Sequence, residues 1–342
     1  MGIRSGFRAA LEKNYPDAFV LRDLESYKSK KIAIDIMTMI FKYKSFTDHW
    51  LEGVETQLNR ILHSKIYPIV VFEGKMPEEK RNECHTRQNK RLELEKKKDR
   101  LRMELDGSKT TGELSEFLID TFNSLNKPKR PTNAAYTLII EGLSVEEYQH
   151  DEDVWYKMAR LEEYTNSIEN QCRMLTSSDI DQVRLLCTSL NIYHFTADGE
   201  AEHACAWLCR NGIVDAVISD DSDLIALLCP IFLSKFKNGQ VIEFSLSKLL
   251  SCSLMTGQQL VDWAIMCGTD YNPNIPRIGV IKAQKMILDY KDIDNIPLDT
   301  NILNHHIVRK IFSLSSLDNS DTMIKVSIDI KNVDMVRIGD RV

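Results

Sequence analysis

Seven acidic residues either follow short apolar runs or open predicted helices. They are Asp35, Glu73, Glu200, Glu202, Asp221, Asp223 and Asp270. In an α/β protein, strand exits and helix starts meet at the carboxyl edge of a parallel sheet. So many carboxylates cannot share one pocket unless cations neutralise them. The pattern therefore predicts a site for hard divalent metal ions, most simply Mg²⁺, which prefers oxygen ligands.

Each acid taken singly has a simpler role. Glu200 and Glu202 suit the positive N-terminal end of a helix, and Asp221 or Asp223 could serve as a loop acid or a cap. Capping alone explains the whole set poorly. Two metal ions about 3.5–4 Å apart can activate water, hold a scissile phosphate and stabilise the leaving oxygen, without a Ser or Cys nucleophile. His203 lies beside the acids, and we interpret it as packed or exposed rather than catalytic.

The elements that must position these acids alternate along the chain. The expected strands are 31–36, 66–72, 192–195 and 216–219, with a hairpin around Asn238-Gly239. The expected helices cover 7–19, 37–63, 77–105, 179–190, a segment from 200, 258–267 and 279–289. Residues 106–108 are loop-like. This alternation predicts an α/β fold with a mostly parallel, doubly wound sheet.

Composition sets broader limits. The 342 residues are 43% hydrophobic, enough for one large domain or two closely joined ones. We find neither an apolar run long enough to span a membrane nor a signal peptide, which predicts an intracellular protein. Cys205 and Cys209 share a helix face, which favours core packing over zinc. The net charge is −6, but Lys and Arg gather in 75–104, where a local basic surface could bind phosphates.

Five short motifs surround the acids in a fixed order. After an N-terminal Met1-Gly2-Ile3 they are Ile32-Ala33-Ile34-Asp35, Val71-Phe72-Glu73-Gly74-Lys75, Glu200-Ala201-Glu202, Asp221-Ser222-Asp223 and Gly268-Thr269-Asp270-Tyr271. Together they resemble the flap endonuclease/XPG family of structure-specific 5′ nucleases, with Glu73 in place of the usual Asp. The resemblance covers about 1–105 and 176–290. It implies a PIN-like or resolvase-like nuclease core, a twisted sheet flanked by helices, a helical arch and a C-terminal helix-turn-helix.

The same resemblance assigns roles to residues outside the acidic motifs. Lys80 and Arg87 lie seven and fourteen residues beyond Glu73, where family members place cations that reach the scissile phosphate. The alternative for this pair is an ordinary solvated helix surface. Phe41 occupies the position of an aromatic that stacks on the base near the cut, although it could equally be a core residue. Gly2 belongs to the N-terminal start and is predicted to bind DNA.

Residues 275–283 resemble the family's helix-turn-helix, which contacts the duplex backbone, often through K⁺. Arg277 stands where Gly is usual and Ile281 where a basic residue is usual, which argues against K⁺ here. Arg277, Gly279 and Lys282 are instead predicted to contact phosphates directly.

The resulting hypothesis is a Mg²⁺-dependent 5′ nuclease, endonuclease or 5′ exonuclease, that cuts branched, flapped or nicked DNA in replication, repair or recombination. Mn²⁺ would substitute for Mg²⁺. One alternative is a 5′→3′ exoribonuclease or other RNA nuclease, whose acidic motif is similar to Gly199-Glu200-Ala201-Glu202-His203. Another is a non-catalytic scaffold for DNA junctions, for which Glu73 leaves some room.

The predicted division of the chain is 1–105 for the first part of the nuclease core with the gateway helix, 106–175 for an enlarged arch, 176–295 for the rest of the core, and 296–342 for an extension. No sliding-clamp motif is evident near the C-terminus. The enlarged arch and the lack of an evident sliding-clamp motif would suit a divergent or viral member of the family. Such a protein would act in the nucleus or, if viral, at a cytoplasmic replication site.

Overall fold

The computed structural model describes residues 3, 6–125 and 152–332. It divides into two units. The sheet unit consists of Met1–Tyr43, Asp48–Glu83 and Thr176–Val342, and the helical unit of Lys44–Thr47 and Cys84–Leu175. Gly2 lies outside the described residues, as does the 126–151 part of the predicted arch.

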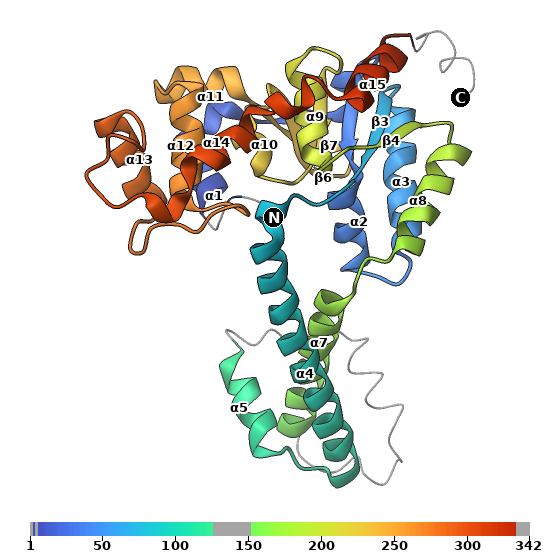
Figure 1. Cartoon of the computed structure of the whole chain (residues 1–342). Coiled ribbons are helices and arrows are strands. Elements are labelled where there is room, and N and C mark those ends of the chain that lie inside the picture. The colour runs from blue at the N-terminus through green and yellow to red at the C-terminus, as the bar shows by residue number, and fades with distance from the viewer. Residues whose placement is uncertain (1–2, 4–5, 126–151, 333–342) are drawn as a thin grey trace. The chain divides into compact units, whose positions relative to one another are not determined.

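One seven-stranded sheet forms the centre of the sheet unit (Figure 1). Its spatial order is β1-β7-β6-β5-β2-β3-β4. The strands are β1 (Phe19–Asp23), β2 (Lys31–Asp35), β3 (Tyr67–Phe72), β4 (Tyr193–Thr196), β5 (Ala216–Ile218), β6 (Ile231–Lys237) and β7 (Gln240–Ser245). Strands β6, β5, β2, β3 and β4 run parallel, whereas β7 is antiparallel to both β6 and β1. The predicted mostly parallel α/β sheet is confirmed.

The predicted hairpin joins β6 to β7. Asn238 and Gly239 have φ values of 52° and 79°. Both lie in the left-handed region that a two-residue turn between twisted strands requires, and Asn and Gly adopt it at least cost. The turn chemistry that was visible in the sequence therefore sets the position of this hairpin.

The central strands are buried because helices pack against them. Ile32, Ala33 and Ile34 of β2 are fully buried. Helix α9 (Ala201–Arg210) packs on β2, β3 and β5, while α3 (Trp50–His63) packs on β3 and on α8 (Ser177–Ser189). Near-continuous apolar runs are what a covered parallel sheet requires. This packing fixes the strand ends, and with them the side chains that follow each strand.

The remaining helices of the sheet unit are α1 (Phe7–Asn14), α2 (Ile36–Lys44), α10 (Asp223–Ala226), α11 (Leu246–Ser253), α12 (Gly257–Cys267), α13 (Val280–Tyr290), α14 (His305–Ser313) and α15 (Asp321–Asn332). Short 3₁₀ turns occur at η1 (Pro16–Ala18), η2 (Leu24–Tyr27), η3 (Glu78–Lys80), η5 (Asn301–Leu303) and η6 (Ser315–Leu317). Side chains of α14 and α15, among them Val308, Phe312 and Val326, share the core of the sheet unit.

The helix predicted over 7–19 is too long. Helix α1 ends at Asn14, and Phe19 already begins β1. Pro16 explains the early end, because it has no N–H for a helical hydrogen bond and disfavours the helical conformation of the residue before it.

The helical unit contains α4 (Arg81–Thr111), α5 (Glu116–Ser124) and α7 (Glu152–Cys172). Its small core includes Leu101, Leu105, Leu118 and Leu161. The loop predicted at 106–108 is wrong, because α4 continues as helix to Thr111. Leu101 and Leu105, one helical turn apart, pack in the core of the helical unit, and this packing offsets the roughly 1 kcal/mol that Gly107 costs inside the helix. None of the described helices combines the length and the apolar composition needed to cross a bilayer.

Candidate active site

Three neighbouring parallel strands deliver four of the predicted acids to one edge of the sheet. Asp35 is the last residue of β2, and Glu73 directly follows β3. Asp221 follows β5 and lies two residues before Asp223, which begins α10. Strand β2 pairs in parallel with both β3 and β5, so these strand ends are adjacent. The expectation that strand order would bring the acids together is met for this group.

Two helix termini supply the other acids. Glu200 is the N-cap residue of α9, and Glu202 lies in that helix's first turn. Asp270 follows α12, whose C-cap residue Gly268 has a φ of 84°. A tight turn then holds the segment, since the Thr269 hydroxyl donates to Asn272 Oδ1 at 2.7 Å. All three carboxylates are buried.

Lys80 joins these three carboxylates. Its Nζ donates to Glu200 and lies 3.7 Å from Glu202 Oε1 and 3.4 Å from Asp270 Oδ2. Only 11% of the Lys80 side chain is exposed. Burial by itself lowers the pKa of Lys80, but the charges of Glu202, Glu200 and Asp270 outweigh it and hold that pKa above its ordinary value. The ammonium therefore stays charged and partly neutralises the cluster.

A chain of hydrogen bonds orders the acids at the strand ends. The Ser219 hydroxyl donates to Asp35 Oδ2 at 2.8 Å and accepts the Asp221 N–H at 3.1 Å. The Asp223 N–H donates to Asp221 Oδ1 at 2.9 Å. Burial raises the pKa of Asp35 to about 7, and the charges of Asp221 and Glu73 act in the same direction. The role of Ser219 was missed in the sequence, although this residue lies two positions before the fourth acidic motif.

The burial of Asp223 carries an electrostatic cost. It is fully buried, and among the described residues neither of its carboxylate oxygens has a hydrogen-bond partner. Burial, followed by the charges of Asp221 and Asp270, raises its pKa well above the ordinary value. Burial and the charge of Glu200 raise the pKa of Glu202 as well. A buried carboxylate left without a partner among other carboxylates fits a hard cation, which would supply the missing positive charge.

His203 and Tyr271 complete the cluster. Nε2 of His203 lies 3.5 Å from Glu200 Oε2 and 3.1 Å from the Tyr271 hydroxyl, which also donates to Glu200. Ligand atoms of Glu200, Glu202 and His203 lie within 4.8 Å of one another, so this trio could hold a metal ion. Burial lowers the pKa of His203 to about 4, so the imidazole is neutral near pH 7. Sequence reasoning missed the role of Tyr271 in holding Glu200.

Comparison with known proteins identifies the family. A model of the XPG N-terminal domain matches residues 1–94, and a model of the XPG I-region matches 191–270. A probable RAD2-like endonuclease of Invertebrate iridescent virus 3 is 31% identical over 320 residues, which are 85% of this chain and 80% of the relative. The chain belongs to the XPG family. It is a structure-specific nuclease of that family, and its viral relative agrees with the expectation of a divergent, viral type of member.

Further similarities agree with this assignment. Flap endonuclease 1 of Glycine max is 28% identical over 322 residues, covering 88% of this chain and 69% of the relative. The catalytic core of Rad2 in complex with DNA substrate has the same fold, with a TM-score of 0.55 and 16% identity over 94% of this chain and 79% of that one. The junction-resolving enzyme GEN1 in complex with product DNA and Mg²⁺ also has this fold, with a TM-score of 0.53 and 16% identity over 95% of this chain and 68% of that one.

Other predicted site residues of this XPG-family chain lie outside the carboxylate cluster or in the other unit. Phe41 lies on α2 and is 38% exposed, so it is not an ordinary buried core residue. Arg87 lies on the α4 segment of the helical unit. Gly2 lies outside the described residues.

The predicted phosphate-binding turn precedes α13. Gly279 is the N-cap residue of that helix, and Arg277 and Lys282 are exposed on either side of it. Arg277 has a φ of 65°, which lies in the left-handed region where glycine is favoured. This backbone conformation is compatible with the Gly that the resemblance leads us to expect at that position. The turn thus has a backbone conformation that favours glycine while it presents the exposed cation of Arg277.

Proposed function

We propose that this XPG-family nuclease hydrolyses phosphodiester bonds in flapped, branched or nicked DNA with the help of two Mg²⁺ ions, for which Mn²⁺ substitutes. The observation that carries the proposal is the carboxylate cluster itself. In it Asp223, which is fully buried and has no hydrogen-bond partner among the residues that the structure describes, lies among acids whose pKa values are raised. The fold is that of Rad2 bound to DNA substrate and of GEN1 bound to product DNA and Mg²⁺, which supports both the substrate and the ion.

Oxygen ligands for the ions would come from seven residues: Asp35, Glu73, Glu200, Glu202, Asp221, Asp223 and Asp270. Bound there, the ions would supply a nucleophilic water near neutral pH and offset the charge that develops on the phosphate. The protein's own groups prepare this site. Ser219 and the Asp223 N–H fix the carboxylates of Asp35 and Asp221, so little reorganisation is needed when DNA arrives.

Positively charged groups on the protein would hold the substrate. Lys80 already lies beside Glu200, Glu202 and Asp270 with its ammonium charged, so it can reach a phosphate placed among these acids. Arg87, on the part of α4 that belongs to the helical unit, would also bind a phosphate of the substrate.

The duplex would rest on the turn before α13. The first N–H groups of a helix lack intrahelical acceptors and bind phosphate, and Arg277 and Lys282 add two exposed cations there. The exposed ring of Phe41 would stack on the base beside the cut. Gly2 would contact DNA from the N-terminus.

In this proposal 1–105 and 176–295 form the nuclease core, 106–175 an arch and 296–342 an extension.

Point substitutions separate chemistry from binding. We expect Asp221→Ala and Glu202→Ala to abolish cleavage of a labelled 5′-flap duplex while binding of the same duplex, measured in Ca²⁺, changes less than threefold. Asp181→Ala, which removes an exposed acid on α8, is the matched control and should cleave normally. Turnover by either site variant at the wild-type rate would refute the assignment.

The polymer that is cut needs its own test. The resemblance of Gly199-Glu200-Ala201-Glu202-His203 to an exoribonuclease motif keeps RNA as a second candidate. Matched DNA and RNA flaps of one sequence decide between them. We expect faster cleavage of the DNA flap, and preferential cleavage of RNA would favour the RNA nuclease.

A further inference from the structure

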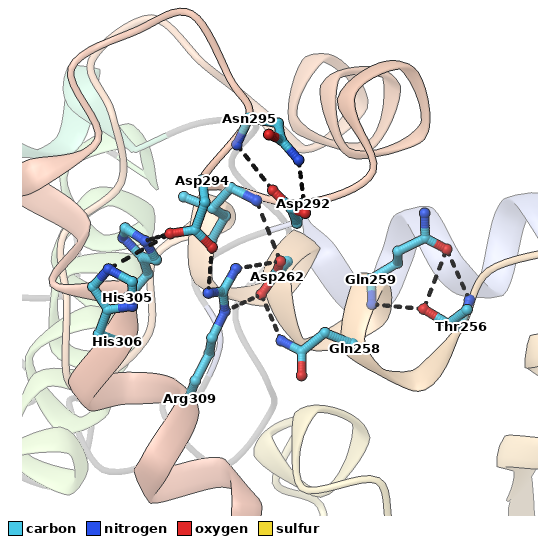
Figure 2. A network of polar contacts seen from close by, with 11 residues as sticks. Thr256, Gln258, Gln259, Asp262, Asp292, Asp294, Asn295, His305, His306 and Arg309 are labelled. Carbon is cyan, nitrogen blue, oxygen red and sulfur yellow. Dashed lines mark hydrogen bonds and ion pairs between the residues drawn. The ribbon is translucent and has the colours of Figure 1, made fainter.

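Two adjacent histidines and one aspartate converge at a second place in the sheet unit (Figure 2). Nε2 of His305 lies 2.7 Å from Asp294 Oδ1, and Nε2 of His306 lies 3.5 Å from the same oxygen. Ligand atoms of the three residues all lie within 4.8 Å of one another. His305 is buried, whereas 74% of the His306 side chain and 43% of the Asp294 side chain are exposed. The trio is therefore fixed on one side and open to solvent on the other.

Ordinary helix geometry does not require this convergence. His305 and His306 are the first two residues of α14, and neighbouring residues of a helix do not face the same way. Here the preceding Asn304 adopts a left-handed conformation with a φ of 47°. The two imidazole rings lie 4.1 Å apart between centroids, with an angle of 38° between their planes. The ring nitrogens of both histidines thus lie near the same oxygen of Asp294.

A layer of hydrogen bonds behind the trio orients its carboxylate. Arg309 Nη1 donates to Asp294 Oδ2 at 2.6 Å, so it occupies the oxygen that faces away from the histidines. The same guanidinium makes a bidentate pair with the fully buried Asp262, at 2.7 and 2.6 Å. Gln258 Nε2 donates to Asp262 Oδ1 at 2.9 Å (Figure 2). Asp294 Oδ1 is thus presented to the histidines by a buried, charge-paired support of the kind that positions metal ligands.

We propose that Asp294, His305 and His306 bind a divalent transition-metal ion, with Zn²⁺ as the representative probe. Two imidazoles and one carboxylate suit Zn²⁺, Co²⁺ or Ni²⁺ better than Mg²⁺, whose preferred ligands are oxygens. Water would complete the coordination on the exposed side. The ion would fasten the segment after α13 to the start of α14, and thereby stabilise the part of the chain that follows the proposed DNA-binding turn. This site is independent of the carboxylate cluster and of the proposed nuclease activity.

Zn²⁺ titration of the full chain tests the site. Isothermal titration calorimetry is run in excess Mg²⁺, which keeps the carboxylate cluster occupied. His306→Gln and Asp294→Asn are chosen because both side chains are partly or largely exposed, and His85→Gln, which removes an exposed histidine on α4, is the matched control. We expect one Zn²⁺-binding step in the wild type that weakens at least tenfold in both variants and is unchanged in the control.

Thermal denaturation provides a second readout, since an ion that binds only the folded chain raises its melting temperature by mass action. Zn²⁺ should raise the melting temperature of the wild type and of His85→Gln but not that of His306→Gln, even when each carries Glu202→Gln to remove the active-site ligand. Identical Zn²⁺ isotherms for the wild type and both site variants would overturn the proposal, as would a wild type that binds no Zn²⁺.

Discussion

Removing one charge from the carboxylate cluster should stabilise the metal-free protein. Asp223 is 0% exposed and neither carboxylate oxygen has a hydrogen-bond partner among the described residues, while Asp221 and Asp270 add like charge. A buried group without a partner costs about 1–3 kcal/mol when it is neutral and more when it is charged, and an amide in its place would keep only the neutral part of that cost. Asp223→Asn keeps the shape of the side chain and removes the charge. We therefore expect the free energy of unfolding in chelator to rise by about 1–3 kcal/mol, with about 2–4 °C in melting temperature for each kcal/mol.

When Mg²⁺ is added, the wild type should become more stable than Asp223→Asn. The wild type gains about 2.7 kcal/mol from a ligand present at about 100 times its dissociation constant, whereas the variant has lost a ligand and gains less. Calorimetric or fluorescence melting in EDTA and in saturating Mg²⁺ measures both states, and flap cleavage in Mg²⁺ should be lost in the variant.

A second buried aspartate provides the control. Asp262 is also 0% exposed, but Arg309 pairs with both of its oxygens. Asp262→Asn should therefore destabilise the protein in EDTA and in Mg²⁺ alike, since it leaves a guanidinium without its full partner. If Asp223→Asn melted below the wild type in EDTA, the electrostatic reasoning about the cluster would be refuted.

Three further predictions concern charged side chains. Lys80→Met should lower the free energy of unfolding in EDTA by about 3 kcal/mol, because three carboxylates lose a shared ammonium, and an unchanged melting curve would contradict this. Arg87→Ala should slow flap cleavage about 10²–10³-fold in single-turnover assays, while Lys90→Ala on the same helix changes it less than about twofold; equal rates would exclude the phosphate role. Burial raises the pKa of Glu12, but Lys235 and a neighbouring arginine outweigh this effect, so the pKa of Glu12 lies below its ordinary value. The ion pairs of Glu12 therefore stabilise the fold above about pH 4.5, and this stabilisation is lost as the pH falls through the lowered pKa. Glu12→Gln should thus cost less than about 1 kcal/mol at pH 7 and nothing near pH 2 in urea titrations, and a difference that persisted in acid would contradict the assignment.

The sheet was predictable because its central strands carry the signal locally. The runs Ile32-Ala33-Ile34 and Val70-Val71-Phe72 are buried on both faces, and each ends at an acid. Parallel pairing then places the ends of β2, β3 and β5 side by side, so the meeting of Asp35 with Asp221 required only the strand order.

What the sequence did not show depends on tertiary packing. Gly107 suggests a loop, but apolar contacts of the helical unit carry α4 through it to Thr111. Lys80 was predicted to contact a phosphate, yet its close approach to the three acids follows from how η3 lies against α9 and the turn after α12. The approach of Asp294 to His305 likewise depends on Arg309, which is fixed by a distant Asp262. No local pattern encodes such contacts.

Counting bound ions tests most directly whether the seven carboxylates form one cation site. Mn²⁺ binding is measured by electron paramagnetic resonance on His306→Gln, a background that removes the second proposed metal site. We predict two Mn²⁺ ions per chain that Mg²⁺ displaces, and loss of at least one of them in Asp35→Asn and in Asp223→Asn together with loss of flap cleavage. Mn²⁺ isotherms that are the same in all of these variants, or no bound Mn²⁺ at concentrations that support cleavage, would contradict the account.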